Sequence, residues 1–167
     1  EVRGVRAELR IMAPPWVVFG VLRSVEEFPS RFGDLGVVSC AVEQELSATE
    51  RLVRTRELQR FMCFTFASET LMLMRENRNV MRFEYELRHS PTLRRCDATW
   101  DIVSIREKGG EEVTVLRYEG KIAPAIPVPS SVFNGMLKFS AMGRLQRIRQ
   151  WCEDIAGETQ SKKSKSK

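Results

Sequence analysis

The chain has 167 residues, enough for one domain and short for two, and its 43% hydrophobic and 29% charged residues are ordinary for a globular domain. No run of about 18 apolar residues is present, which argues against a membrane-spanning helix. The formal net charge is +5, but the last seven residues, SKKSKSK, hold four lysines and no acid. We therefore expect one near-neutral domain over residues 1–157 and a disordered basic tail over residues 158–167, which meets solvent or contacts RNA or an anionic membrane surface.

The cysteines and the histidine give no sign of a metal site. Cys40, Cys63, Cys96 and Cys152 are far apart, none forms a CxxC pair, and His89 is the single histidine. Each cysteine has apolar neighbours, so we expect buried free thiols in a reducing compartment. The histidine falls in an expected surface loop, and no Ser/His/Asp set, glycine-rich phosphate loop or pair of buried carboxylates accompanies it. The sequence predicts no catalytic residue, no metal and no cofactor.

The N-terminal part of the chain predicts one strand followed by two short helices. Residues 2–12 read as a strand, and Pro14 and Pro15 then suit the start of a helix, where the missing N–H groups would have no partner. Ser24, with Glu27 three residues later, resembles a capping box at the start of the second helix.

From Val37 onward the hydrophobic period is two, and short turns between the segments indicate antiparallel pairing. The expected strands cover residues 37–46, 51–61, 63–75, 79–88, 96–105 and 113–122. In NVMRFEYELR, residues 79–88, one face carries Met81, Phe83, Tyr85 and Leu87. Such a bulky face lies either against a packed core or against a cavity, and the period does not distinguish these alternatives.

Charged residues fill the positions that we expect to point away from the core. They are Arg51, Arg54, Arg56, Arg60, Arg82 and Arg88, interleaved with Glu57, Glu84 and Glu86. Because the glutamates largely neutralise the arginines, we expect a mixed, solvated outer face rather than a basic patch.

The C-terminal part predicts one long helix. Three prolines within residues 124–129 end the strand pattern, and apolar residues then recur at three- and four-residue steps over about residues 131–156, before Gly157. Arg144, Arg147 and Arg149 lie mostly off this apolar stripe, on the side that we expect to face solvent. A strongly curved antiparallel sheet cannot bury its concave face on itself, whereas a helix with one apolar side can cover it. We therefore predict an α+β helix-grip fold: a curved antiparallel sheet of about seven strands around a long C-terminal helix, with two short helices after the first strand.

This arrangement and several segments resemble the START-like or SRPBCC superfamily, which includes polyketide cyclase/dehydrase and coenzyme Q-binding proteins. The segments are VEEFPSRFGDLGVVSCAVEQ (residues 25–44), MRFEYEL (81–87), CDATWDIVSI (96–105) and VTVLRYEGKIAPAIPVPSSVF (113–133). The resemblance covers nearly the whole domain, and its diffuse motifs indicate a fold more than a function.

The resemblance implies an interior cavity that binds or transfers a hydrophobic small molecule, such as an isoprenoid quinone, a lipid or a pigment. The expected ligand-binding residues are Met72, Met74, Met81, Phe83, Tyr85, Trp100, Tyr118, Phe133 and Leu137. Two alternatives stay open: a non-catalytic accessory subunit of a larger organellar protein complex, and, with less support, a polyketide-cyclase-like enzyme. An open cavity favours the binding protein, and a filled interior favours the accessory subunit.

The expected location is a mitochondrion or a plastid, after removal of a targeting peptide. The chain starts at Glu1 rather than Met, and quinone-handling members of the superfamily that it resembles work in those organelles.

Overall fold

The computed structural model describes residues 2–61, 63–110 and 112–165. Its elements, in chain order, are β1 (Arg3–Ile11), α1 (Pro15–Arg23), η1 (Val25–Glu27), α2 (Phe28–Phe32), η2 (Gly33–Leu35), β2 (Val37–Glu45), β3 (Glu50–Phe61), β4 (Phe64–Asn77), β5 (Arg82–His89), β6 (Leu93–Arg106), β7 (Glu112–Pro124) and α3 (Ser130–Lys165). The seven strands form one sheet in the order β1-β7-β6-β5-β4-β3-β2, and every neighbouring pair is antiparallel.

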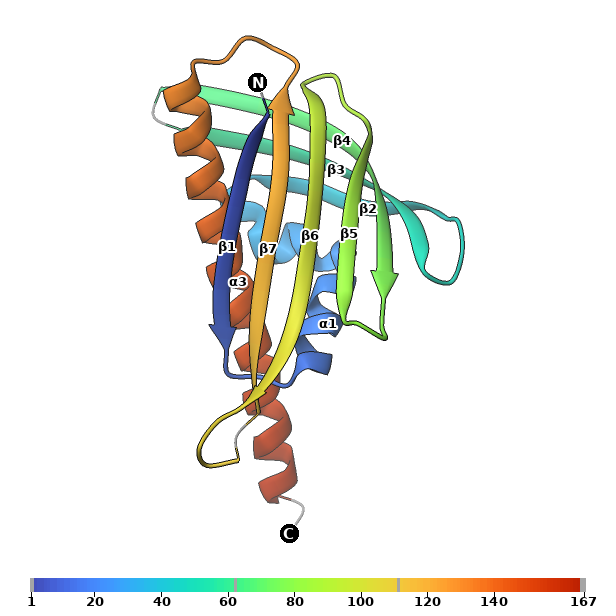
Figure 1. Cartoon of the computed structure of the whole chain (residues 1–167), viewed down its shortest axis with the longest axis vertical. Helices are drawn as coiled ribbons and strands as arrows, with labels where there is room; N and C mark the ends of the chain where they lie inside the picture. Colours follow the sequence, from blue (N-terminus) through green and yellow to red (C-terminus); the bar gives the residue numbers. More distant parts are fainter. Residues whose placement is uncertain (1, 62, 111, 166–167) are drawn as a thin grey trace.

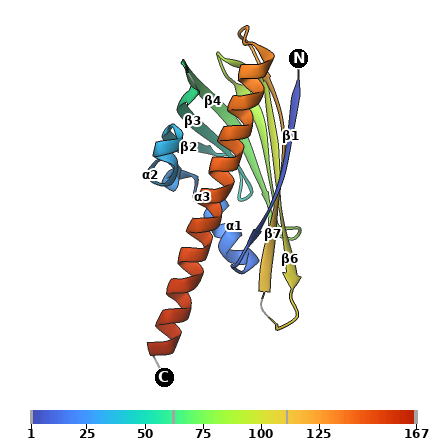
Figure 2. The same cartoon turned by 90° about the vertical axis from the view of Figure 1, so that its left-hand side faces the viewer.

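The sheet is strongly curved, and α3 lies along its hollow side. β2, β3 and β4 cross the direction of β1, β6 and β7 (Figure 1), while the view at 90° places α3 in front of the sheet with α1 and α2 beside it (Figure 2). The predicted α+β helix-grip fold is therefore confirmed. The sequence segments between β1 and β2 form the short helices that were expected there.

Two strands differ locally from their predicted pattern. A register shift between Val37 and Ser39 turns Val38 outward, where it is exposed, and leaves Val37 buried in its place. β5 begins at Arg82 because Met81 has a left-handed backbone with a φ of 51° and belongs to the turn before the strand. In both places the expected alternation of inward and outward side chains is interrupted, once by a register shift and once by a turn residue. The hydrophobic pattern of the sequence does not reveal either feature.

The final helix is longer than predicted. α3 continues through Gly157 to Lys165, so the expected end at Ala156 is wrong. Glycine stops a helix when it adopts a left-handed backbone, but Gly157 is not among the glycines with positive φ, and Thr159 donates a hydrogen bond of 2.9 Å to the carbonyl of Ile155 across this turn. The C-terminal turns of α3 extend past the sheet (Figure 2). The separation of residues 158–167 as a tail stays a prediction, with a helical backbone as far as Lys165.

A densely packed core fills the hollow of the sheet beside α1, and we call this half of the interior the closed end. The ring of Phe19 on α1 lies 4.5 Å from that of Phe83 on β5, and both residues are buried. Trp151 on α3 meets the rings of Phe28 and Phe32 edge-on at 6.4 Å. Contacts of this kind between large aromatic side chains make this half of the interior the main source of stability.

One carboxylate at the closed end is almost completely buried. The side chain of Glu76 is 2% exposed and accepts hydrogen bonds from Arg23 on α1 at 2.8 Å, from Arg51 on β3 at 3.1 Å and from Arg78 in the β4–β5 turn. Burial by itself raises the pKa of Glu76, but the three arginines hold it below its ordinary value. The carboxylate therefore joins three separate segments through ion pairs.

The outer face of the sheet is mixed in charge, as expected. Arg54 is paired with Glu43 and Glu69, Arg82 with Asp101, and Arg88 with Glu86. Two expectations about this face are wrong. Glu57 points to the inner side of β3 with its side chain only 16% exposed, and Arg51 is only 12% exposed because it pairs with the buried Glu76. No helix in the described part of the chain is long and apolar enough to cross a bilayer.

The four cysteines are free thiols, but they are not all buried. Cys40 and Cys152 are buried, Cys96 is half-buried and Cys63 is exposed. The expectation of four buried thiols is therefore wrong for Cys63, which lies in the turn between β3 and β4.

Candidate ligand-binding cavity

A cavity of about 270 Å³ occupies the other half of the interior, between the sheet and the N-terminal half of α3. We call this half the open end. All seven strands contribute to its lining, and α3 covers it with residues from Phe133 to Ile148. The short helices contribute Leu22, Val25, Phe28 and Phe32, and the loop before α3 contributes Ile126 and Val128. The volume is close to the lower limit of about 300 Å³ for typical small-molecule sites.

Six of the nine residues predicted to bind a ligand line this cavity. They are Met72, Tyr85, Trp100, Tyr118, Phe133 and Leu137. The other three do not line it: Phe83 and Met74 are buried in the closed end, and Met81 packs against the same core. The physical reason is α1, whose side chains cover that part of the inner face.

An aromatic pair forms one wall of the cavity. The rings of Trp100 on β6 and Tyr118 on β7 are neighbours across the two strands, with centroids 4.5 Å apart. Gly120 makes room for this arrangement, because a Cβ atom there would lie only 2.4 Å from the Tyr118 hydroxyl oxygen. Burial raises the pKa of Tyr118 to about 12 and raises that of Tyr85 further, so both hydroxyls are neutral hydrogen-bonding groups at neutral pH.

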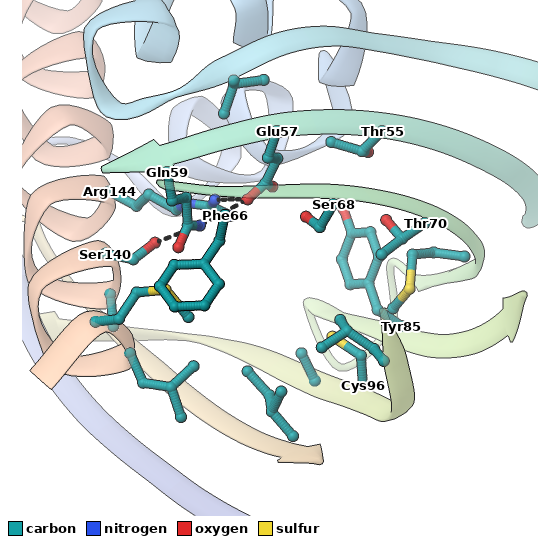
Figure 3. A pocket seen from close by; sticks show the side chains of 18 of the residues that line it. Thr55, Glu57, Gln59, Phe66, Ser68, Thr70, Tyr85, Cys96, Ser140 and Arg144 are labelled. Atoms are coloured by element: carbon teal, nitrogen blue, oxygen red, sulfur yellow. Dashed lines mark hydrogen bonds and ion pairs between the residues drawn. The ribbon is translucent and has the colours of Figure 1, made fainter. Parts of the chain in front are cut away.

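A charged pair lies inside the cavity, beneath α3. Arg144 Nη2 donates a hydrogen bond of 2.5 Å to Glu57 Oε2, and Gln59 Nε2 donates one of 2.8 Å to the same oxygen. The same Gln59 nitrogen lies 3.3 Å from Ser140 Oγ, which connects β3 to α3 a second time. Figure 3 shows these four side chains together on the α3 side of the cavity, and we call them the polar cluster.

The guanidinium of Arg144 stays charged in this position. Burial by itself lowers its pKa, but the adjacent Glu57 carboxylate raises it, and the net shift is upward. Within the described part of the chain, Nε of Arg144 is a buried donor without an acceptor. An unpaired buried donor costs about 1–3 kcal/mol, so the surroundings of Arg144 favour an additional acceptor oxygen.

A second set of polar groups faces the cavity from the other side. Ser68 and Thr70 on β4 lie near Tyr85, away from the polar cluster (Figure 3). Thr55 on β3 is hydrogen-bonded to the Cys40 thiol, with 3.4 Å between Oγ1 and Sγ. Burial raises the pKa of the Cys96 thiol, which also lines the cavity, to about 12. These groups are neutral, so the charge in the cavity is concentrated in the polar cluster.

Sequence reasoning missed the polar cluster, although signals for it exist. Glu57 follows Val53 by four residues, and a strand period of two therefore places it on the face of the buried valine. Ser140, Arg144 and Ile148 are spaced by four, which puts the arginine on the same side of α3 as the buried isoleucine. Both residues were assigned to solvent because they are charged.

Metal ligands do not gather in this cavity or elsewhere in the described part of the chain, where no group of three or more His, Cys, Asp or Glu side chains has a suitable arrangement. What the cavity offers is an apolar, aromatic interior with a few convergent polar groups. This combination is typical of sites for small organic molecules.

Solved structures with the same fold include two aromatase/cyclases and a START superfamily protein. The ZhuI aromatase/cyclase from Streptomyces sp. R1128 matches with a TM-score of 0.76 at 12% identity, over 92% of this chain and 94% of that one. A START superfamily protein from Mycobacterium smegmatis matches with a TM-score of 0.66 at 13% identity, over 93% of this chain and 98% of that one. The di-domain aromatase/cyclase BexL of the BE-7585A biosynthetic pathway matches with a TM-score of 0.65 at 14% identity, over 93% of this chain and 50% of that one.

No protein-family model and no curated protein sequence matches the chain. At the identities found, structural similarity establishes the fold and leaves the ligand and the activity open. The chain therefore shares its fold with these aromatase/cyclase and START superfamily structures.

Proposed function

We propose that the protein binds a hydrophobic small molecule with a few oxygen or nitrogen functions in the cavity at the open end. The single observation that carries the proposal is this space of about 270 Å³ with aromatic walls. An accessory subunit that used the fold only as a scaffold would have no need of such a space, and a packed interior would be more stable. The cavity therefore supports a binding protein over an accessory subunit.

The size of the cavity favours a compact ligand. A pocket near the lower limit for small-molecule sites, about 300 Å³, accommodates a small ring system or a short chain. A long prenyl or acyl chain would have to extend past Ile126 and Val128 in the loop before α3. Of the ligands considered above, a quinone ring or a pigment of a few rings fits better than a whole lipid.

Tryptophan fluorescence provides the test, because Trp100 is in the cavity wall and Trp16 is 61% exposed on α1. Titration with 1,4-naphthoquinone should quench the wild-type emission in a saturable way. The saturable part should disappear in Trp100→Phe and persist in the matched control Trp16→Phe. Quenching that rises linearly without saturation in all three proteins would contradict a binding site in the cavity.

A cyclase-like enzyme is the second candidate, and the ion pair between Glu57 and Arg144 favours it. A carboxylate in an enclosed cavity is a group of the kind that removes protons, and a guanidinium stabilises a developing oxyanion. Two of the structures with this fold are described as aromatase/cyclases. Incubation with an aryl 1,3-diketone that carries a third ketone tests this candidate. Cyclisation with loss of one water, abolished in Glu57→Gln while binding remains, is the expected result for an enzyme, and an unchanged diketone excludes it.

An organellar location, a larger protein complex and a contact of the basic C-terminal residues with RNA or an anionic membrane stay predictions from the sequence. Fractionation of the source cells tests the first of these directly.

A further inference from the structure

The polar cluster has an unusual charge balance for a binding site. Its arginine, Arg144, is already paired with a carboxylate, Glu57, so the two formal charges cancel inside the cavity. The remaining members, Gln59 and Ser140, are neutral. A ligand that enters the cavity therefore meets strong hydrogen-bonding groups of both kinds but no net charge.

Each partner in the ion pair has hydrogen-bonding capacity left. Both hydrogen bonds that Glu57 accepts in the described part of the chain go to Oε2, which leaves Oε1 as an acceptor. A guanidinium has five N–H donors, of which Arg144 uses one at Nη2, and its Nε has no acceptor among the described residues. A donor and an acceptor thus stand next to each other in the polar cluster.

We propose that the polar cluster selects a neutral ligand that carries a hydrogen-bond acceptor and a donor side by side, and that it discriminates against carboxylates. Primary amides, hydroxyketones and enolised 1,3-diketones belong to this class. The inference rests on the proposed function, because it specifies the ligand of the same cavity. In the complex, the acceptor of the ligand receives an N–H of Arg144 and its donor reaches Glu57 Oε1.

A carboxylate ligand is disfavoured by the same geometry. To reach Arg144 it must approach Glu57, so that two carboxylates share one guanidinium whose side chain is 30% exposed. Like charges next to each other discriminate effectively between partners that are otherwise similar in shape. An apolar ligand of the same shape fits the aromatic walls but leaves both spare hydrogen-bonding groups unpaired.

Three probes of nearly equal shape test the inference by calorimetric titration: 2-naphthamide, 2-naphthoate and 2-isopropylnaphthalene. For the wild-type protein we expect the amide to bind about tenfold more tightly than either of the others, because one hydrogen bond to a charged group raises affinity by at least about tenfold. In Glu57→Gln the negative charge is gone, so 2-naphthoate should gain about tenfold and bind about as tightly as the amide.

Arg147→Gln is the matched control. It removes an arginine one turn from the site, on the exposed side of α3, where Arg147 pairs with Asp34 outside the cavity. The ranking of the three probes in this variant should equal that of the wild type.

The possible failures have different meanings. If none of the three probes binds to the wild-type protein, the proposed function fails and the inference with it. If 2-isopropylnaphthalene or 2-naphthoate binds as tightly as the amide, a ligand site exists but the inference is wrong. An unchanged ranking in Glu57→Gln also overturns it, and the wild-type ranking decides the matter even if that variant does not fold.

Discussion

The two halves of the interior are built on the same sheet and the same helix, yet one is packed and the other is hollow. β5 shows the difference within two steps of a single face: Phe83 is completely buried beneath Phe19, whereas Tyr85 lines the cavity. β4 repeats it, with Met74 in the core and Met72 in the cavity wall. The strands are not what distinguishes the two ends.

The two ends differ in the helix side chains that lie over the inner face of the sheet. At the closed end the side chains of α1 and α3 meet above the sheet. At the open end α3 is joined by Leu22 of α1, Val25 of η1 and Phe28 and Phe32 of α2, which border the cavity without filling it. A helix laid across a wide, curved sheet leaves space on its flanks that its own side chains do not fill. The Phe19 ring of α1 fills that space above Phe83 at the closed end, whereas α1 contributes the smaller Leu22 side chain to the cavity lining at the open end.

The largest expected effect is on the stability of the protein when the two inner-face residues of β5, Phe83 and Tyr85, are each replaced by alanine. Phe83→Ala should lower the free energy of unfolding by about 3–5 kcal/mol, the usual cost of removing a packed aromatic side chain. Tyr85→Ala should cost about 1–2 kcal/mol, because one side of that ring already faces the cavity and loses few contacts. Urea unfolding followed by circular dichroism measures both values. Equal losses at the two positions would mean that the open end is packed as tightly as the closed end.

The second prediction concerns the buried carboxylate of the closed end. Glu76→Gln should cost about 2 kcal/mol, less than a fully buried ion pair, because Arg23 and Arg78 are about half exposed. The matched control is Glu69→Gln, which removes a carboxylate from two exposed arginines on the outer face and should have no measurable effect.

The pH dependence of this effect has a definite sign. The pKa of Glu76 is lowered by folding from its ordinary value of 4.5, so its contribution is complete above pH 4.5 and is lost as the pH falls through the lower value of the folded state. The difference in unfolding free energy between wild type and Glu76→Gln should therefore be constant from pH 6 to 8 and shrink below about pH 4.5. A difference that grows on acidification contradicts the assignment.

The sequence predicted the fold and part of the cavity wall, but not the boundary between the packed and the hollow end. A period of two identifies the inner face of β5, and it says nothing of what covers Phe83 or Tyr85, because the covering residues come from α1 and α3, far away in the chain. Charged residues were assigned to solvent, which failed for Glu57 and Arg144 because each compensates the other when buried. The predicted helix end at Gly157 was wrong because glycine adopts helical as well as left-handed backbone angles, so the residue type alone does not determine where the helix ends.

The smallest expected effect is a difference in the rate at which thiols from the two ends react with a modifying reagent. It leaves the stability of the protein unchanged. Burial raises the pKa of Cys96 and of Cys152 to about 12, so neither forms much thiolate at pH 8, but Cys96 is half-buried in the cavity wall while Cys152 is completely buried in the core. With iodoacetamide under native conditions, Cys63 should therefore react first because it is exposed, Cys96 more slowly, and Cys152 only on unfolding.

A saturating cavity ligand should slow the modification of Cys96 alone, since it occupies the space from which the reagent approaches, and peptide mapping by mass spectrometry follows each site separately. Were Cys96 and Cys152 modified at the same rate, access to both would depend on the same opening of the protein, and the cavity would not be a separate compartment. Were Cys96 modified at its own rate but unprotected by 1,4-naphthoquinone, the compartment would exist and that ligand would bind elsewhere. The thiol at the cavity wall thus reports access to the open end and its occupancy without altering either end of the interior.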